Sequence, residues 1–168
     1  PAGAAVDRLR AAFAPIAGDF GRAWKLRAKH QPAKVVIMVS RFDHCLVDLL
    51  YRKRMGELNM DVVGIVSNHP RQADYPAPIE GIPYHYLPIT RETKPQQEAQ
   101  VKRIVEDTGA ELVVLARYMQ ILSDDMARFL SGRCINIHHS FLPGFKGAKP
   151  YHQAHARGVK MIGATAHY

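Results

Sequence analysis

Short runs of apolar, mostly β-branched residues alternate with helical patterns from residue 34 to the end of the chain. Such a run is typical of a strand that is buried on both faces of a parallel sheet. Strands are expected at 35–39, 61–67, 82–87, 111–116, 133–137 and 161–168. Helices are expected between them at 43–55, 93–108, 123–130 and 150–157. The alternation predicts an α/β fold with a doubly wound, mostly parallel sheet.

The first 28 residues follow a different pattern. Residues 4–14 carry apolar side chains at helical spacing, and residues 20–28 alternate as a strand would. Lys29 to Ala33 is a polar linker that contains a proline, and we place a domain boundary there. The sequence therefore predicts two parts, residues 1–31 and residues 34–168.

Composition narrows the class of protein. The chain has 168 residues, enough for one domain or for one domain with a fragment of a second. Of these residues 47% are hydrophobic and 23% charged, as is ordinary for a soluble globular protein. No apolar run approaches the roughly 20 residues of a membrane span. Cys45 and Cys134 form no disulfide framework, which favours a reduced, cytoplasmic compartment.

The net charge of +8 raises the question of a nucleic-acid partner. The basic residues are spread along the chain without interleaved aromatic residues, so we expect neither a nucleic acid nor a membrane as partner. A solvated basic surface, or attraction to an anionic small molecule, is the better interpretation of the charge. His152 and His155 have a spacing that could bind a metal, but no acidic or cysteine partner lies nearby, and no metal is expected.

The segment from Cys134 to Pro143 carries the strongest candidate for chemistry. Asn136 and His138 are two positions apart on a predicted strand, so their side chains share one face of it. An amide donor and an imidazole suit chemistry at a carbonyl carbon. An isolated Asn-x-His pattern also fits a buried pair that satisfies its own hydrogen bonds. The glycine- and proline-containing loop 140–147 that follows favours a ligand site.

Two further loops are expected at the same edge of the sheet. Residues 115–122 remain apolar beyond a buried strand, which fits either a slot for a heteroaromatic ring or core packing with an exposed Arg117. The loop from Ser40 to Cys45 has no glycine that would let backbone N–H groups approach a phosphate. Asp43 in that loop is also a plausible helix cap.

Several sequence strings resemble the folate-dependent formyltransferase superfamily. They are Ile135-Asn-Ile-His138, Leu142-Pro143, Ala116 to Leu122 and Gly163-Ala-Thr-Ala-His167. Fuller strings resemble the hydrolytic members of that superfamily, the formyltetrahydrofolate deformylases: Val39 to Cys45, Asn136 to Pro143 and Pro150-Tyr-His-Gln-Ala154. The resemblance covers residues 34–168, and residues 1–28 are similar to the tail of an ACT-type regulatory domain.

The resemblance implies an enzyme that hydrolyses 10-formyltetrahydrofolate to formate and tetrahydrofolate without a cofactor, supplying formate for purine synthesis and balancing the one-carbon folate pools. Asn136 and His138 match the catalytic Asn and His. Met119, Gln120, Ile121 and Leu122 match the loop that holds the pterin, and Leu142 and Pro143 belong to the substrate site. Phe42 and His44 stand where the glycinamide ribonucleotide formyltransferases have a glycine-rich phosphate loop.

The resemblance further implies a homo-oligomer and a chain that lacks parts at both ends. The third catalytic residue, an aspartate, is expected beyond Tyr168. Two alternatives stay open. The first is transfer of the formyl group to an amine acceptor such as glycinamide ribonucleotide. The second is a folate- or amino-acid-sensing module without turnover.

Overall fold

The computed structural model describes residues 2–21, 24, 26–28, 30–71, 79, 81–138, 150–158 and 165–167. The chain divides into two compact units, Pro1–Pro32 and Ala33–Tyr168. In the described parts of both units, no helix is both long enough and apolar enough to cross a membrane. The assignment of residues 1–31 to an ACT-type domain remains a prediction.

Among the described residues of the first unit there is one helix, α1 (Ala2–Asp19), which is longer than the predicted 4–14 and runs through Pro15. The strand predicted at 20–28 is wrong for the residues described there, since none of them lies in a strand. The Trp24 ring instead packs edge-on against Phe13 of α1, with 5.2 Å between ring centroids. An alternating pattern makes a strand only where a second strand supplies hydrogen bonds, and the described part of this unit contains none.

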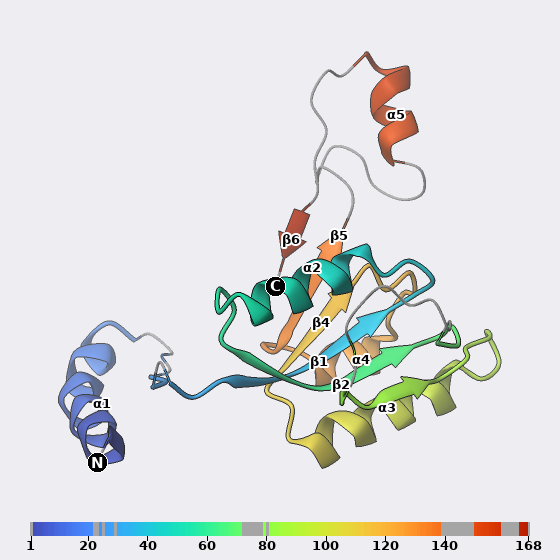
Figure 1. Cartoon of the computed structure of the whole chain (residues 1–168). Helices are drawn as coiled ribbons and strands as arrows, with labels where there is room; N and C mark the ends of the chain where they lie inside the picture. The colour runs from blue at the N-terminus through green and yellow to red at the C-terminus, as the bar shows by residue number, and fades with distance from the viewer. Residues whose placement is uncertain are drawn as a thin grey trace. The chain divides into compact units, whose positions relative to one another are not determined.

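The second unit contains one sheet in the order β3-β2-β1-β4-β5-β6 (Figure 1). Its strands are β1 (Ala33–Val39), β2 (Met60–Ser67), β3 (Tyr84–Tyr86), β4 (Leu112–Ala116), β5 (Cys134–His138) and β6 (Thr165–His167). All neighbouring strands pair in parallel except β6, which runs antiparallel to β5. The predicted doubly wound, mostly parallel sheet is therefore confirmed.

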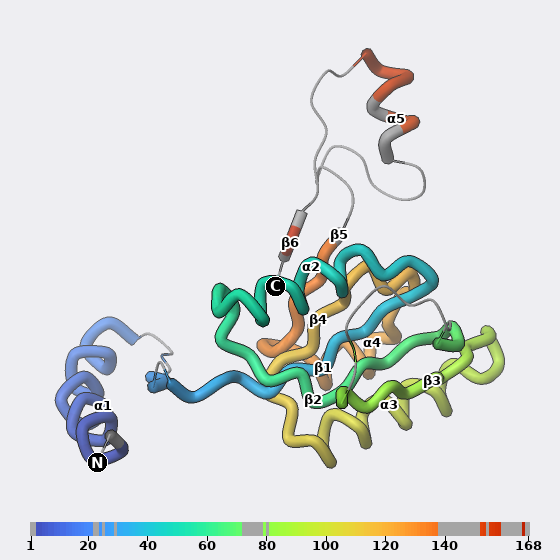
Figure 2. The backbone as a smooth tube through the Cα atoms, viewed as in Figure 1, coloured from blue at the N-terminus to red at the C-terminus, as the bar shows by residue number. Residues whose placement is uncertain are grey.

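The helices of this unit are α2 (His44–Arg54), α3 (Lys94–Thr108), α4 (Asp124–Phe129) and α5 (Pro150–Ala156). α2 covers one face of the sheet, and α3 and α4 cover the other (Figures 1 and 2). Successive residues of β1 enter opposite layers: Val35, Ile37 and Val39 pack under α2, whereas Val36 and Met38 pack against α3 and α4. The apolar run is buried on both sides because strand residues alternate between faces.

The strand order reverses its direction between β1 and β4. From β1 the chain builds outward through β2 to β3, and then returns to place β4 and β5 on the other side of β1. In open sheets of this kind, ligands bind beyond the carboxyl ends of the strands where the order reverses. A ligand site is therefore expected at the loops that follow β1 and β4.

Candidate functional site

The loops after β1 and β4 are joined directly by a hydrogen bond. Ser40, the residue after β1, is buried, and its Oγ accepts a hydrogen bond of 2.9 Å from the backbone N–H of Met119. A residue 79 positions further along the chain is thereby fixed to the end of β1. The hydrogen bond holds the two loops together at the carboxyl ends of β1 and β4, where the strand order reverses.

Residues 118–123 form a loop between β4 and α4 that is anchored at its ends and exposed in its middle. Tyr118 is buried, whereas 56% of Met119 and 87% of Ile121 are exposed. Gln120 is partly buried, and Leu122 packs against the core on the α3 side. Exposed apolar side chains beside buried, hydrogen-bonded neighbours are a favourable surface for a flat ring.

Arg117, the first residue after β4, lies against the loop that follows β1. Its guanidinium carbon is 4.6 Å from the centroid of the Phe42 ring, within the range of a cation–π interaction. Its Nε is buried and has no hydrogen-bond partner among the described residues. The alternative with an exposed Arg117 does not hold, because Arg117 is partly buried and its guanidinium lies over the ring of Phe42.

The backbone of Arg117 has a φ of 58°, in the left-handed region that favours glycine. It is the one described residue other than glycine with a positive φ. Its N–H donates to the carbonyl of Leu115, at 3.1 Å, so the chain turns sharply as it leaves β4. No local sequence signal predicts this turn, because arginine usually avoids the conformation.

Asp43 lies at the N-terminus of α2, but its side chain does not cap that helix. The backbone carbonyl of Asp43 accepts from Val47 N–H at 2.8 Å, while Oδ2 is buried without a partner in the described part of the chain. The prediction of a side-chain cap is therefore wrong. His44, one residue later, begins α2 and is exposed. The loop after β1 thus presents Phe42 and His44 outward and keeps a carboxylate oxygen of Asp43 inside.

β5 carries the two residues predicted to be catalytic. Asn136 is partly buried and lies beside Leu115 of β4, while His138 is the last residue of the strand, described here by its backbone alone. On the other side Asn136 is paired with His167 of β6. Both residues thus lie on the strand that adjoins β4, near its carboxyl end. Leu142 and Pro143 lie outside the described residues, and the catalytic roles remain predictions.

Neither cysteine is suited to act as a nucleophile. Burial raises the pKa of the Cys45 thiol above its ordinary value, although the charge of Arg117 acts in the opposite direction. Burial likewise raises the pKa of Cys134, the first residue of β5. A thiol with a raised pKa stays protonated near neutral pH and is a poor nucleophile.

Comparison with known proteins identifies the family. Residues 33–168 match the family model described as formyl transferase. The chain belongs to the formyl transferase family. The formyltransferase-like α/β fold that its sequence strings imply is thereby confirmed.

Curated relatives are formyltetrahydrofolate deformylases. The protein of Corynebacterium sp. (strain P-1) is 56% identical over 165 residues, which make up 97% of this chain and 57% of that protein. The protein of Mycobacterium tuberculosis is 48% identical over 166 residues, 98% of this chain and 53% of that protein. The chain thus spans little more than half the length of these relatives.

Solved structures divide into a nearer and a more distant group. The crystal structure of formyltetrahydrofolate deformylase from Burkholderia mallei has a TM-score of 0.83 and 61% identity, over 97% of this chain and 58% of that one. Phosphoribosylglycinamide formyltransferase from Coxiella burnetii has a TM-score of 0.73 and 27% identity, over 82% and 65% of the two chains. Both share the fold, and the sequence is much closer to the hydrolase.

Proposed function

We propose that the protein represented by this chain hydrolyses 10-formyltetrahydrofolate to formate and tetrahydrofolate. The observation that carries this proposal is the contact of Phe42 with Arg117 across the carboxyl ends of β1 and β4. A glycine-free loop with a stacked aromatic side chain offers no backbone cradle for the phosphate of an acceptor substrate. The high identity to relatives named deformylase supports the same choice.

In the proposed reaction a water oxygen attacks the formyl carbon that is bonded to N10 of the folate. The carbonyl oxygen becomes an oxyanion, which the amide of Asn136 and a protonated His138 would stabilise as hydrogen-bond donors. The bond from carbon to N10 then breaks, N10 takes up one of the two protons of the attacking water, the other passes to solvent, and formate leaves without transfer to a second substrate. Positioned proton transfer of this type typically contributes about 10²- to 10⁴-fold to the rate.

The substrate itself is held, in this proposal, by the loop that follows β4. The pterin ring lies along Met119 to Leu122, where apolar side chains are exposed next to backbone polar groups. Phe42 and His44 close the side on which a transferase would admit its acceptor. Leu142 and Pro143 complete the substrate site. The protein needs no cofactor, because water is the nucleophile and the folate is the substrate.

The decisive experiment supplies the full-length protein with 10-formyltetrahydrofolate, with and without glycinamide ribonucleotide. We expect formate and tetrahydrofolate to appear in equal amounts whether or not the acceptor is present. Formylation of glycinamide ribonucleotide at a comparable rate would establish a transferase instead. Folate binding by calorimetry without any release of formate would establish a sensing module.

The wider setting belongs to the same proposal. We place the protein in the cytoplasm as a homo-oligomer, with a small-molecule folate as its partner and no nucleic-acid or membrane partner. Its formate would feed purine synthesis, and its turnover would balance the formylated and free folate pools. A salt-dependent mobility shift with nucleic acid would contradict this assignment, since electrostatic nucleic-acid binding weakens steeply with salt.

A further inference from the structure

Most of the buried polar side chains in the described residues converge on one loop. Four polar or charged residues are buried in the described part of the chain: Ser40, Ser67, Gln97 and Glu98. Three of these four, all except Ser67, make hydrogen bonds to residues 118–123, the segment between β4 and α4. Buried polar groups are costly unless hydrogen-bonded, so such a concentration on one segment needs a reason.

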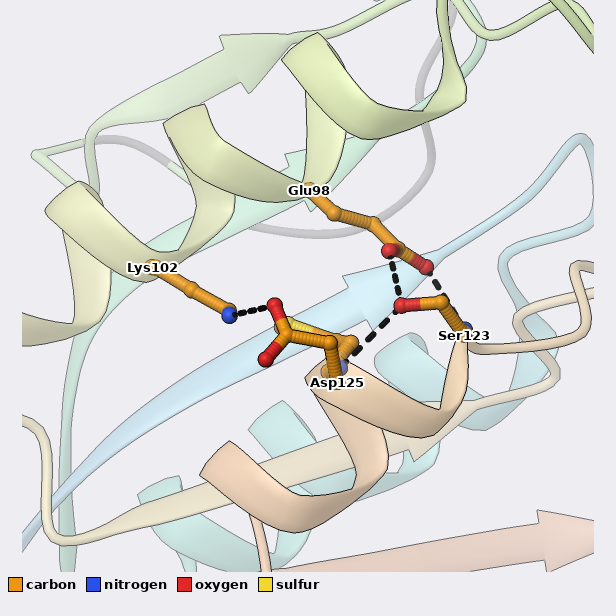
Figure 3. A network of polar contacts seen from close by, with 5 residues as sticks. Glu98, Lys102, Ser123 and Asp125 are labelled. Atoms are coloured by element: carbon orange, nitrogen blue, oxygen red, sulfur yellow. Dashed lines mark hydrogen bonds and ion pairs between the residues drawn. The ribbon is translucent and has the colours of Figure 1, made fainter.

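The contacts hold the segment at both of its ends. At the beginning, Gln97 Nε2 donates to the Tyr118 hydroxyl oxygen at 3.0 Å, and Ser40 Oγ accepts from Met119 N–H at 2.9 Å. At the end, one carboxylate oxygen of Glu98 accepts from Ser123 N–H at 2.9 Å, and the other accepts from the Ser123 hydroxyl (Figure 3). Between these ends Met119 and Ile121 remain exposed.

Ser123 also connects the segment to α4, because it is the N-cap of that helix. Its Oγ accepts from the backbone N–H of Met126 at 3.1 Å, as an N-cap does, while its own hydroxyl proton goes to Glu98. Met126 in turn is fully buried in the core between α4 and the sheet. The end of the segment is thereby fixed to two helices, and its beginning to a helix and a strand end.

We propose that Ser40, Gln97 and Glu98 are positioning residues that fix the segment 118–123 in its ligand-binding conformation before the folate arrives. This inference rests on the proposed function, since it takes the exposed middle of the segment as the pterin site. Packing alone would be served by apolar side chains, because replacing buried polar groups with well-packed apolar ones is often neutral or stabilising. Fixing a loop in advance removes the entropy that binding would otherwise lose.

The expected kinetic signature is a change in KM rather than in kcat. The bond that breaks is at N10, one methylene group away from the pterin ring, and the ring itself is unchanged in the reaction, so its contacts are the same in the ground state and the transition state. Loss of such uniform binding raises KM and leaves kcat unchanged. We expect Glu98→Ala and Gln97→Ala to raise KM about tenfold in the full-length protein, with kcat within about twofold of wild type.

Two further variants separate positioning from general stability. Glu98→Gln keeps one acceptor for Ser123 N–H and should recover most of the wild-type KM. Lys102→Ala is the matched control: Lys102 lies one turn beyond Glu98 on α3, and its ion pair is with Asp125 of α4, a residue outside the segment (Figure 3). It should leave KM unchanged. A wild-type KM in folded Glu98→Ala, or an equal rise in Lys102→Ala, would overturn the proposal.

Hydrogen exchange on the ligand-free proteins tests the positioning role without turnover. The amides of Met119 and Ser123 should exchange at least tenfold faster in Glu98→Ala than in wild type, while amides of β1 stay protected. Unchanged exchange at both amides would contradict the proposal even if the enzyme is active. Faster exchange in Glu98→Ala, combined with a wild-type protein that releases no formate, would leave the positioning role standing and remove the proposed function. If Glu98→Ala does not fold, Tyr118→Phe removes the acceptor of Gln97 and serves the same two measurements.

Discussion

At the scale of single residues, Arg117 combines a left-handed backbone with a buried guanidinium nitrogen that has no described hydrogen-bond partner. Both features are unfavourable for folding, and the contact with Phe42 offsets part of their cost. Backbone outliers of this type concentrate at functional sites, and this one lies where the strand order reverses. The turn that Arg117 makes after β4 therefore shapes the candidate site at the expense of some stability of the fold.

Two replacements of Arg117 separate the contribution of its backbone conformation to the free energy of unfolding from the contribution of its side chain. Arg117→Ala removes the guanidinium but keeps the unfavourable φ, whereas Arg117→Gly removes both. We expect Arg117→Gly to be more stable than Arg117→Ala by about 1 kcal/mol, because left-handed backbone costs a residue with a Cβ about that much. Urea denaturation at equilibrium measures the difference. Equal midpoints for the two variants would show that the turn relaxes without strain.

The proposed catalytic pair makes the second prediction at this scale. In the full-length protein, Asn136→Ala should lower kcat by at least 10²-fold, since one oxyanion donor is typically worth about 3 kcal/mol of barrier. His138→Ala should lower it by a similar factor or more. Folate binding should persist in both variants, as measured by calorimetry.

The control for these variants is His30→Ala, which changes an exposed histidine of the first unit. It should retain the wild-type rate. A variant of Asn136 or His138 that binds folate and turns over at a near-normal rate would remove that residue from the mechanism.

At the scale of elements, α3 has two separate tasks. Val101 and Val105 pack into the core against the sheet, while Gln97 and Glu98 near its N-terminus hold the loop after β4. The helix ends at Gly109, whose φ of 64° lets its N–H bond back to the carbonyls of Glu106 and Val105. This left-handed residue ends the helix before β4 begins.

Gly109→Ala tests how much that helix end contributes. A Cβ at this position would meet only the Nζ of Lys34, at 3.9 Å, so steric contact adds little. We therefore expect a loss of about 1 kcal/mol in the free energy of unfolding, which reflects the backbone alone. Thermal or urea denaturation measures it, and Gly56→Ala, at a second positive φ with nothing within 4 Å, gives a comparison. No loss in either variant would contradict the assignment to backbone strain.

At the scale of the whole molecule, three buried or partly buried acids affect how stability depends on pH. Burial raises the pKa of both thiols, Cys45 and Cys134, and that of the Tyr118 hydroxyl, which Gln97 partly opposes as a donor. For an acid whose pKa is higher in the folded state, the stabilisation is complete below the pKa of the unfolded chain. It is lost as pH rises through the folded pKa.

The protein should therefore lose stability at alkaline pH. The decline should begin near pH 9, the ordinary pKa of a thiol, and continue beyond pH 10 as Tyr118 becomes ionised. Urea midpoints at neutral and alkaline pH measure this loss. The double variant Cys45→Ala, Cys134→Ala should show a shallower decline. An equal decline in that variant would assign the effect to other groups.

The sequence alone predicted most elements because their signals are local. The run 35–39 is β-branched and apolar, and it became the central strand of the sheet, buried on both faces. The helical pattern at 123–130 is confirmed as α4, which Ser123 caps with its side chain. The strand predicted from the alternation in residues 20–28 is wrong, since a strand also needs a neighbouring strand to hydrogen-bond with, and a local pattern does not show whether one is present.

What the amino-acid sequence determined by itself is the order of strands and helices, the family strings around Asn136 and His138, and hence the family. What only the tertiary structure decided is which distant side chains meet. The contact of Phe42 with Arg117 and the bonds of Ser40, Gln97 and Glu98 to residues 118–123 join positions 21 to 79 residues apart. Periodicity and propensity describe neighbours along the chain, whereas such contacts depend on strand order and register, which are settled only when the sheet assembles.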